Sequence, residues 1–160
     1  MKVEAQKEHA WLRRMVGGWT YEIEACMKPG EAPVKFGGRE VVRSAGDIWI
    51  IADGEGEMPG GGTGKTMLTA GYDTRSNRFV GSWVGSMMTY LWVYEGELDS
   101  AQKVLTLNCE GPDFMGDSGT LKYKDVHTLI SDNERTLTGN VLGKDGKWTE
   151  MMMCKYRRVR

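Results

Sequence analysis

Apolar and polar residues alternate along most of this chain, and a period of two places successive side chains on opposite faces of a β-strand. In the segment LTLNCEG, Leu105, Leu107 and Cys109 alternate with polar residues. In FVGSWVGSM, Phe79 and Trp83 share one face. The pattern as a whole predicts strands at residues 18–28, 36–45, 47–57, 66–73, 78–87, 90–98, 103–111, 119–130, 134–142 and 147–158.

One segment follows a helical period instead, at about residues 3–16. Trp11 and Met15 lie four positions apart, as do Leu12 and Val16, so all four share one apolar face. Two glycines follow directly, and glycine commonly ends a helix. We expect one N-terminal α-helix whose apolar face closes one end of the strand assembly.

Turn residues separate the predicted strands, and Asp145-Gly146 is a strong hairpin signal. Short strands at regular spacing, with no helical pattern between them, predict an all-β fold: a single antiparallel β-barrel of about ten strands. The 160 residues contain no linker and no internal repeat, so we expect one domain over residues 1–160, with the barrel at about 18–158. A barrel of this size has room for a small ligand.

The segment from Trp83 to Tyr94 is the richest in aromatic and sulfur-containing side chains. Trp83, Trp92 and Tyr94 offer flat apolar surfaces with polar ends, and Met87 offers adaptable packing. Because pockets and cores share this composition, the segment suits a packed core, a subunit interface or the wall of a ligand site. Apolar outer strand faces also make a homodimer plausible.

The segment PGGGTGKTM resembles a phosphate-binding loop, but two requirements fail. The first glycine of that motif should stand at position 59, which is Pro59. The residues after Thr66 favour a strand that ends in a turn, whereas the motif must begin a helix. We therefore interpret this segment as a hairpin loop at one mouth of the barrel, and we do not expect NTPase activity.

Charge and composition exclude further classes. The formal net charge is −1, so nucleic acid is not an expected partner. No apolar run approaches the roughly 20 residues that cross a bilayer, and the polar N-terminal segment lacks the apolar core of a signal peptide, so we expect a cytoplasmic protein without a membrane partner. The three cysteines, Cys26, Cys109 and Cys154, suggest neither a disulfide framework nor a metal site.

Gly17 and Trp19 form a Gly-x-Trp at the start of the first predicted strand, and the last strand ends with Arg157 and Arg158. With these residues, both ends of the chain resemble the calycin superfamily, which includes lipocalins, fatty-acid-binding proteins and nitrobindin-like barrels. The resemblance implies a calycin-like (lipocalin-like) barrel in which Trp19 closes the floor and an arginine of the last strand packs across it. We expect Arg158 to be that arginine, because a guanidinium over an indole ring gains about 0.5–2 kcal/mol.

Nitrobindin-like proteins hold haem through a histidine near the end of the chain. This sequence has only His9 and His127, neither of them on the last predicted strand. His127 shares a strand face with Asp125 and Tyr123, where a lone histidine is more often structural. We therefore do not expect haem or another cofactor.

A closer resemblance covers nearly the whole chain. HAWLRRMVGGW, GREVVRSAGDIWI, LTAGYDTRSNRFVGSWVGSMMTYLWVYEGELD, LTLNCEGP and YKDV are together similar to an uncharacterised bacterial family grouped with calycins. This resemblance implies the barrel fold and supplies no catalytic residues.

No nucleophile motif of the Gly-x-Ser-x-Gly type and no Ser-His-Asp or Cys-His arrangement is recognisable. We expect the protein to bind a small, mainly apolar molecule inside the barrel, with Trp83, Met87, Trp92 and Tyr94 as wall residues. One alternative is an enzyme that uses one or two inward-facing carboxylates, with Glu110 and Asp125 as the candidates, on a small hydrophobic substrate. Another is an oligomeric scaffold with a filled barrel.

Overall fold

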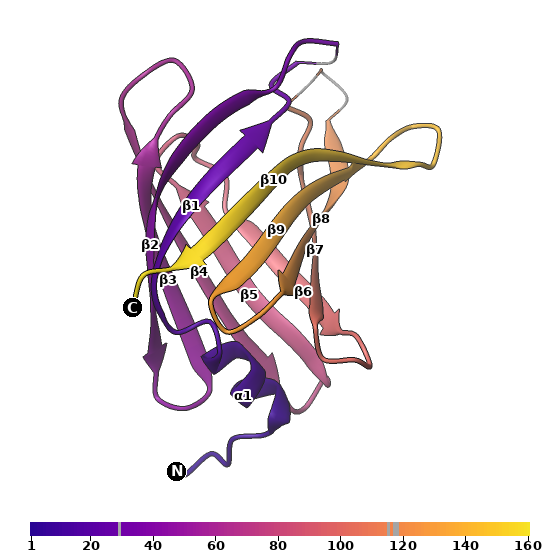
Figure 1. Ribbon diagram of the computed structural model, residues 1–160. Helices are drawn as coiled ribbons and strands as arrows, with labels where there is room; N and C mark the ends of the chain where they lie inside the picture. Colours follow the sequence, from indigo (N-terminus) through magenta and orange to yellow (C-terminus); the bar gives the residue numbers. More distant parts are fainter. Residues whose placement is uncertain (29, 115, 117–118) are drawn as a thin grey trace.

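The computed structural model describes residues 1–28, 30–114, 116 and 119–160, and these form a closed antiparallel barrel of ten strands with one short helix at one end (Figure 1). The predicted fold class is confirmed. The helix is α1 (Lys7–Arg13), and the strands are β1 (Gly17–Ala25), β2 (Val34–Ala45), β3 (Trp49–Glu57), β4 (Thr63–Asp73), β5 (Arg78–Gly85), β6 (Trp92–Leu98), β7 (Val104–Pro112), β8 (Thr120–Leu129), β9 (Glu134–Leu142) and β10 (Trp148–Arg158).

Each strand pairs with its neighbours in sequence, and β1 pairs with β10 to close the wall. The closing ladder runs from Trp19 opposite Arg158 to Ala25 opposite Met152. Because the strands alternate in direction, α1 and four turns lie at one end of the barrel, which we call the helix end, and the other five loops lie at the far end (Figure 1).

The helix is shorter than the predicted segment 3–16. Gln6 caps it in an extended conformation, and its backbone N–H donates to the His9 ring at 2.9 Å. After Arg13, the backbone N–H groups of Met15 and Val16 donate to carbonyls three residues earlier, which ends the α-helical pattern in a tighter turn. The predicted apolar face still forms, because Trp11, Leu12 and Met15 are buried.

Helix α1 is held against the barrel by side-chain hydrogen bonds. The Trp11 indole donates to the carbonyl of Gln102 at 2.8 Å, and the Trp19 indole of β1 donates to the carbonyl of Met15 at 2.8 Å. His9 Nε2 donates to the carbonyl of Tyr72 at 3.0 Å, since its Nδ1 is the acceptor from Gln6.

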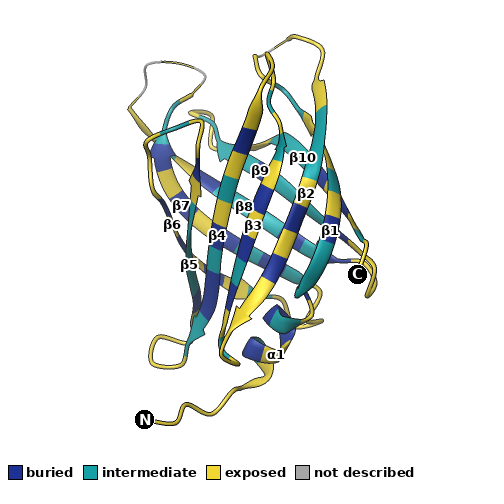
Figure 2. Ribbon diagram, turned by 90° about the vertical axis from the view of Figure 1, so that its left-hand side faces the viewer, coloured by how far each residue is buried: buried dark blue, intermediate teal, exposed yellow. Residues whose placement is uncertain are grey.

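The packed core lies at the helix end. Figure 2 shows buried and exposed residues alternating along the strands, as the sequence pattern predicts. The inward side chains nearest α1 are at most 6% exposed, and these are Val42, Ile50, Ala70, Phe79, Leu105, Leu107 and Leu129. They join Trp11, Leu12, Met15 and Trp19 in one cluster. This end of the barrel is therefore filled by protein.

The glycine-rich segment forms a hairpin turn at the far end, as predicted. The Met58 N–H donates to the Gly62 carbonyl at 3.0 Å, and Gly60, Gly61 and Gly62 have φ values of 89°, 103° and 83°. Only glycine adopts such values readily. Strand β4 begins at Thr63, so no helix follows the glycines.

Within the described parts of the chain, no helix has the length and apolarity that a membrane crossing needs.

Candidate functional site

The inner wall at the far end is less completely buried than the core. Several inward side chains that pack on the core remain only half-buried there, and they come from β1, β5, β8, β9 and β10: Tyr21, Ile23, Trp83, Leu121, Val141 and Met152. Other inward residues of the same wall, Trp92, Tyr94, Cys109 and Tyr123, are buried, so the inner wall at the far end is unevenly covered.

Three of the four predicted wall residues share the inner face of β5 and β6. Trp83 and Trp92 are direct cross-strand partners, and Tyr94 lies two residues further along β6. Trp92 packs edge-on against Tyr123 at 5.1 Å between ring centroids. A Cβ atom at Gly111 would lie 2.3 Å from the Trp92 ring, so the ring requires a glycine at that position.

Met87 is placed differently from the other three. It lies in the turn beyond β5 and is 41% exposed at the rim of the barrel. Met88 is the methionine that packs against the core, and its sulfur accepts a hydrogen bond from the Trp92 indole at 3.2 Å. A turn does not follow strand alternation, which is why the sequence pattern did not separate these two neighbours.

The inner wall carries one carboxyl group bound to a phenol. Tyr94 donates a 2.5 Å hydrogen bond to Oδ2 of Asp125 on β8. Burial raises the pKa of Asp125 to about 6, although the Tyr94 hydrogen bond acts to lower it. Burial also raises the pKa of Tyr94, as does the nearby Asp125 charge, so Tyr94 keeps its proton. Oδ1 of Asp125 accepts no hydrogen bond from any residue that the structure describes.

Glu110 and Asp125, the two predicted catalytic carboxylates, do not meet. Asp125 faces inward opposite Leu107, whereas Glu110 is exposed on the outside of β7, opposite Lys122. The reason is the alternation along β7, because the inward position of Cys109 turns Glu110 outward. The expectation that both could act together inside the barrel is therefore wrong.

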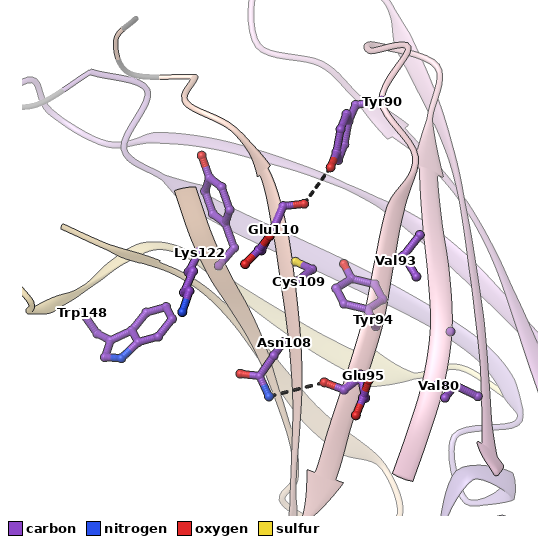
Figure 3. A pocket seen from close by; sticks show the side chains of 12 residues that line it. Val80, Tyr90, Val93, Tyr94, Glu95, Asn108, Cys109, Glu110, Lys122 and Trp148 are labelled. Carbon is purple, nitrogen blue, oxygen red and sulfur yellow. Dashed lines mark hydrogen bonds between the residues drawn. The ribbon is translucent and has the colours of Figure 1, made fainter. Parts of the chain in front are cut away.

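A pocket of about 760 Å³ opens on the outer surface between β6 and β7 (Figure 3). The ladder between these strands pairs only Glu95–Leu98 with residues 105–108, so the two strands are not paired beside Tyr94 and Cys109. Residues of both wall faces consequently line the pocket: Val80, Gly81, Tyr90, Val93, Tyr94, Glu95, Asn108, Cys109, Glu110, Lys122, Tyr123 and Trp148. We call this the β6–β7 pocket.

Two hydrogen bonds bridge the strands at the edges of this pocket. The Tyr90 hydroxyl donates to the Glu110 carbonyl at 2.8 Å, and the Asn108 amide donates to the Glu95 carbonyl at 3.3 Å (Figure 3). Tyr94 and Cys109 lie between the two bridges (Figure 3). The outer surface therefore comes close to the Tyr94–Asp125 pair at this point of the wall.

The helix end contains a buried ion pair that sequence reasoning missed. Arg135 of β9 donates from Nη2 to Oε1 of Glu40 on β2, and Arg135 is only 2% exposed. Its guanidinium lies 3.6 Å from the ring centroid of Tyr156 and 4.6 Å from that of Trp19. Since Glu40 and Arg135 are 95 positions apart, no local pattern connects them.

Arg158 lies over the Trp19 ring at 4.2 Å from its centroid. The same guanidinium donates to the carbonyls of Val16 at 2.6 Å and Arg14 at 2.8 Å, just after α1. Trp19 therefore contacts two arginines, Arg135 and Arg158, and the resemblance to calycins implied only the second. We call Trp19, Glu40, Arg135, Tyr156 and Arg158 the floor cluster.

The other chemically reactive groups inside the barrel are uncharged near neutral pH. Burial lowers the pKa of His127 to about 3, and the Arg135 charge acts in the same direction. Burial raises the pKa of the Cys109 and Cys154 thiols to about 12. Neither thiol is therefore activated as a nucleophile. Among the described residues, no three His, Cys, Asp or Glu side chains are grouped to hold a metal ion.

Replacing Tyr94 by Phe is expected to raise the pKa of Asp125 above its value of about 6. The reason is that the Tyr94 hydroxyl stabilises the carboxylate, and burial alone then acts on it. A titration of the Asp125 side-chain carbon by NMR measures the shift. An unchanged pKa in Tyr94→Phe would show that the hydrogen bond does not form in solution.

Comparison with solved structures finds the same fold at low sequence identity. Rv2717c from M. tuberculosis is 11% identical with a TM-score of 0.62, and the match covers 98% of this chain and 100% of that one. The S-type phycobiliprotein lyase CPES from Guillardia theta is 13% identical with a TM-score of 0.57, covering 98% and 94%. EF1p2_mFAP2b bound to DFHBI is 12% identical with a TM-score of 0.51, covering 94% and 98%. Identities this low establish the fold alone.

No curated protein matches this sequence. A family model described as a protein of unknown function, DUF1579, matches residues 4–158, which is nearly the whole chain. The predicted resemblance to an uncharacterised family with a barrel fold is thus confirmed, and the chain belongs to the DUF1579 family of proteins of unknown function.

Proposed function

We propose that this protein binds a small, mainly apolar molecule inside the far end of its barrel. The observation that carries the proposal is a group of apolar inward side chains at the far end that are only half-buried: Tyr21, Trp83, Val141 and Met152. A wall of large apolar side chains that protein does not fully cover is typical of a ligand site.

The proposed wall combines apolar contact with one polar feature. Trp83 and Trp92 provide ring surfaces, and the Tyr94–Asp125 pair provides a fixed point for a polar group of the ligand. EF1p2_mFAP2b, a barrel of the same fold, was solved bound to DFHBI, which supports the capacity of such a barrel for a small molecule.

Binding is tested first by native mass spectrometry of freshly purified protein, which we expect to show a retained small molecule. Isothermal titration with 1-octanol then measures affinity directly. Trp83→Ala should weaken octanol binding roughly tenfold or more, because one lost aromatic contact of this size is worth over 1 kcal/mol.

The matched variant is Trp148→Ala, which removes an exposed tryptophan from the outer rim of the β6–β7 pocket. We expect it to bind octanol like the unmodified protein. Loss of binding in Trp148→Ala with full binding in Trp83→Ala would place the ligand on the outer surface and contradict the proposal.

The geometry gives less support to the enzyme alternative. Glu110 lies outside the barrel, and the inward carboxylate of Glu40 is already paired with Arg135. Asp125 has no second inward carboxylate beside it among the described residues that raise its pKa. A reaction that needs two neighbouring carboxylates therefore has no site here within the described parts of the wall.

We also propose that the barrel forms a homodimer through the outer face of β2–β5. Val41, Met67 and Val84 point outward from these strands and are 40–55% exposed, and cross-strand pairing through Asp53 places them in one row. Met67→Glu should then convert a dimer to a monomer in analytical ultracentrifugation, because it puts a charge in an apolar contact. A monomer before the substitution would contradict this.

The cytoplasmic location stays a prediction from the sequence, testable by cell fractionation.

A further inference from the structure

We propose that the ligand presents a hydrogen-bond donor, a protonated amine or a hydroxyl group, to Asp125, and that the site discriminates against carboxylates. This inference rests on the proposed function, because it assumes that a small molecule occupies the far end of the barrel. It names the chemical class of that molecule from the charges and hydrogen bonds of the inner wall.

The described part of the inner wall carries no free cation. The lysines and arginines of the strands are exposed or lie on the outer face, with Arg135 and Arg158 as the exceptions. Arg158 lies over the Trp19 ring at the helix end and donates to the carbonyls of Val16 and Arg14. Arg135 is paired with Glu40 and covered by the rings of Trp19 and Tyr156. A ligand carboxylate entering from the far end therefore finds no described arginine or lysine to neutralise it.

Only one of the two carboxylate oxygens of Asp125 accepts a hydrogen bond from a described residue. Tyr94 occupies Oδ2, whereas Oδ1 receives no hydrogen bond from a described residue. On the β9 side, Oδ1 faces Gly139, where a Cβ atom would lie 3.7 Å from it. A carboxylate oxygen that only accepts hydrogen bonds is complementary to an N–H or O–H group.

The other titratable groups around Asp125 do not compensate its charge. Tyr94 from β6 and Cys109 from β7 keep their protons, because burial raises the pKa of both. His127, the next inward residue on β8, is neutral, because burial lowers its pKa. The neighbouring inward residues of β9 and β10 are Gly139 and Met152, which carry no charge. Asp125 thus dominates the local field, which attracts a cation and repels an anion.

The test uses three ligands with the same eight-carbon chain: octylamine, 1-octanol and octanoate. Isothermal titration at about pH 7.5 should show octylamine and octanol binding at least roughly tenfold more tightly than octanoate, since hydrogen bonds to charged groups are worth about a factor of ten or more. Asp125→Asn should weaken octylamine binding by a similar factor while octanol affinity changes by less than about threefold.

A pH series separates the role of Asp125 from general surface charge. Octylamine affinity for the unmodified protein should fall as the pH drops below about 6, where Asp125 takes up a proton, and should stay flat in Asp125→Asn. The matched control is Glu97→Gln, which removes an exposed carboxylate on the outer face of β6 and should bind all three ligands normally. Circular dichroism confirms that each variant is folded.

The outcomes distinguish this inference from the proposed function. If none of the three molecules binds, the proposed function itself fails. If octanoate binds as tightly as octylamine or more tightly, the barrel does bind small molecules and the donor preference is wrong. If octylamine binding is unaffected by Asp125→Asn, the amine does not bind to Asp125 and the inference is overturned.

Discussion

Arg135→Ala is expected to destabilise the protein by about 3–5 kcal/mol, because it leaves the Glu40 carboxylate buried without its partner. The same substitution removes a guanidinium that lies over the rings of Trp19 on β1 and Tyr156 on β10, the two strands that close the barrel. Urea unfolding followed by circular dichroism measures the change in the free energy of unfolding.

Two further variants show whether the charge or the volume of Arg135 matters. Combining Arg135→Met with Glu40→Gln should recover most of the loss, since replacing both partners removes the unpaired charge. Arg157→Ala, which removes an exposed arginine 3.9 Å from Glu134 on the outer face, should change stability by less than about 1 kcal/mol. A loss in Arg135→Ala as small as that in Arg157→Ala would mean that the buried ion pair does not hold the barrel floor.

Asp125→Asn is expected to stabilise the protein at about pH 8, by up to about 3 kcal/mol. The pKa of Asp125 is raised from 3.8 to about 6 by burial, so the folded protein holds this proton more tightly than the unfolded chain does. Stability from the protonated form is therefore complete below about pH 4 and is lost as the pH rises through about 6. Asparagine still accepts the Tyr94 hydrogen bond and carries no charge to bury.

The check is a series of thermal or urea melts of both proteins from about pH 4 to about pH 8. The gain in Asp125→Asn should be small at the acid end and reach its maximum above about pH 7. A gain that is independent of pH, or a loss at every pH, would show that Asp125 is not a buried carboxylate without a neutralising charge. A stabilised variant with weakened octylamine binding would show that the protein retains Asp125 for binding at the expense of stability.

The strands were accessible from sequence because each depends on a local pattern. Alternation such as that of Leu105, Leu107 and Cys109 defines a strand and also its inward face. The same alternation places Glu110 on the opposite face from Cys109, so the sequence itself argues against two inward carboxylates at Glu110 and Asp125. The alternation along β8 also predicts that Asp125, Tyr123 and His127 share one face.

Contacts between distant strands were not accessible in this way. Glu40 reaches Arg135 across 95 positions, and Tyr94 reaches Asp125 across 31. Such contacts depend on the registers of several ladders taken together, and a shift of one residue in any of them would move the side chain to the other face. The incomplete pairing of β6 with β7 has the same origin, because no residue in either strand signals where a ladder stops.

A crystal structure of the protein grown with octylamine at about pH 8 tests the central claim most directly. The account predicts electron density for the alkyl chain of octylamine against the inward faces of Trp83 and Trp92. The amine nitrogen should lie within hydrogen-bond distance of Asp125. Density for octylamine only on the outer surface of the barrel would contradict the account, if Trp83 and Trp92 also pack directly against the opposite inner wall and leave no space for a ligand.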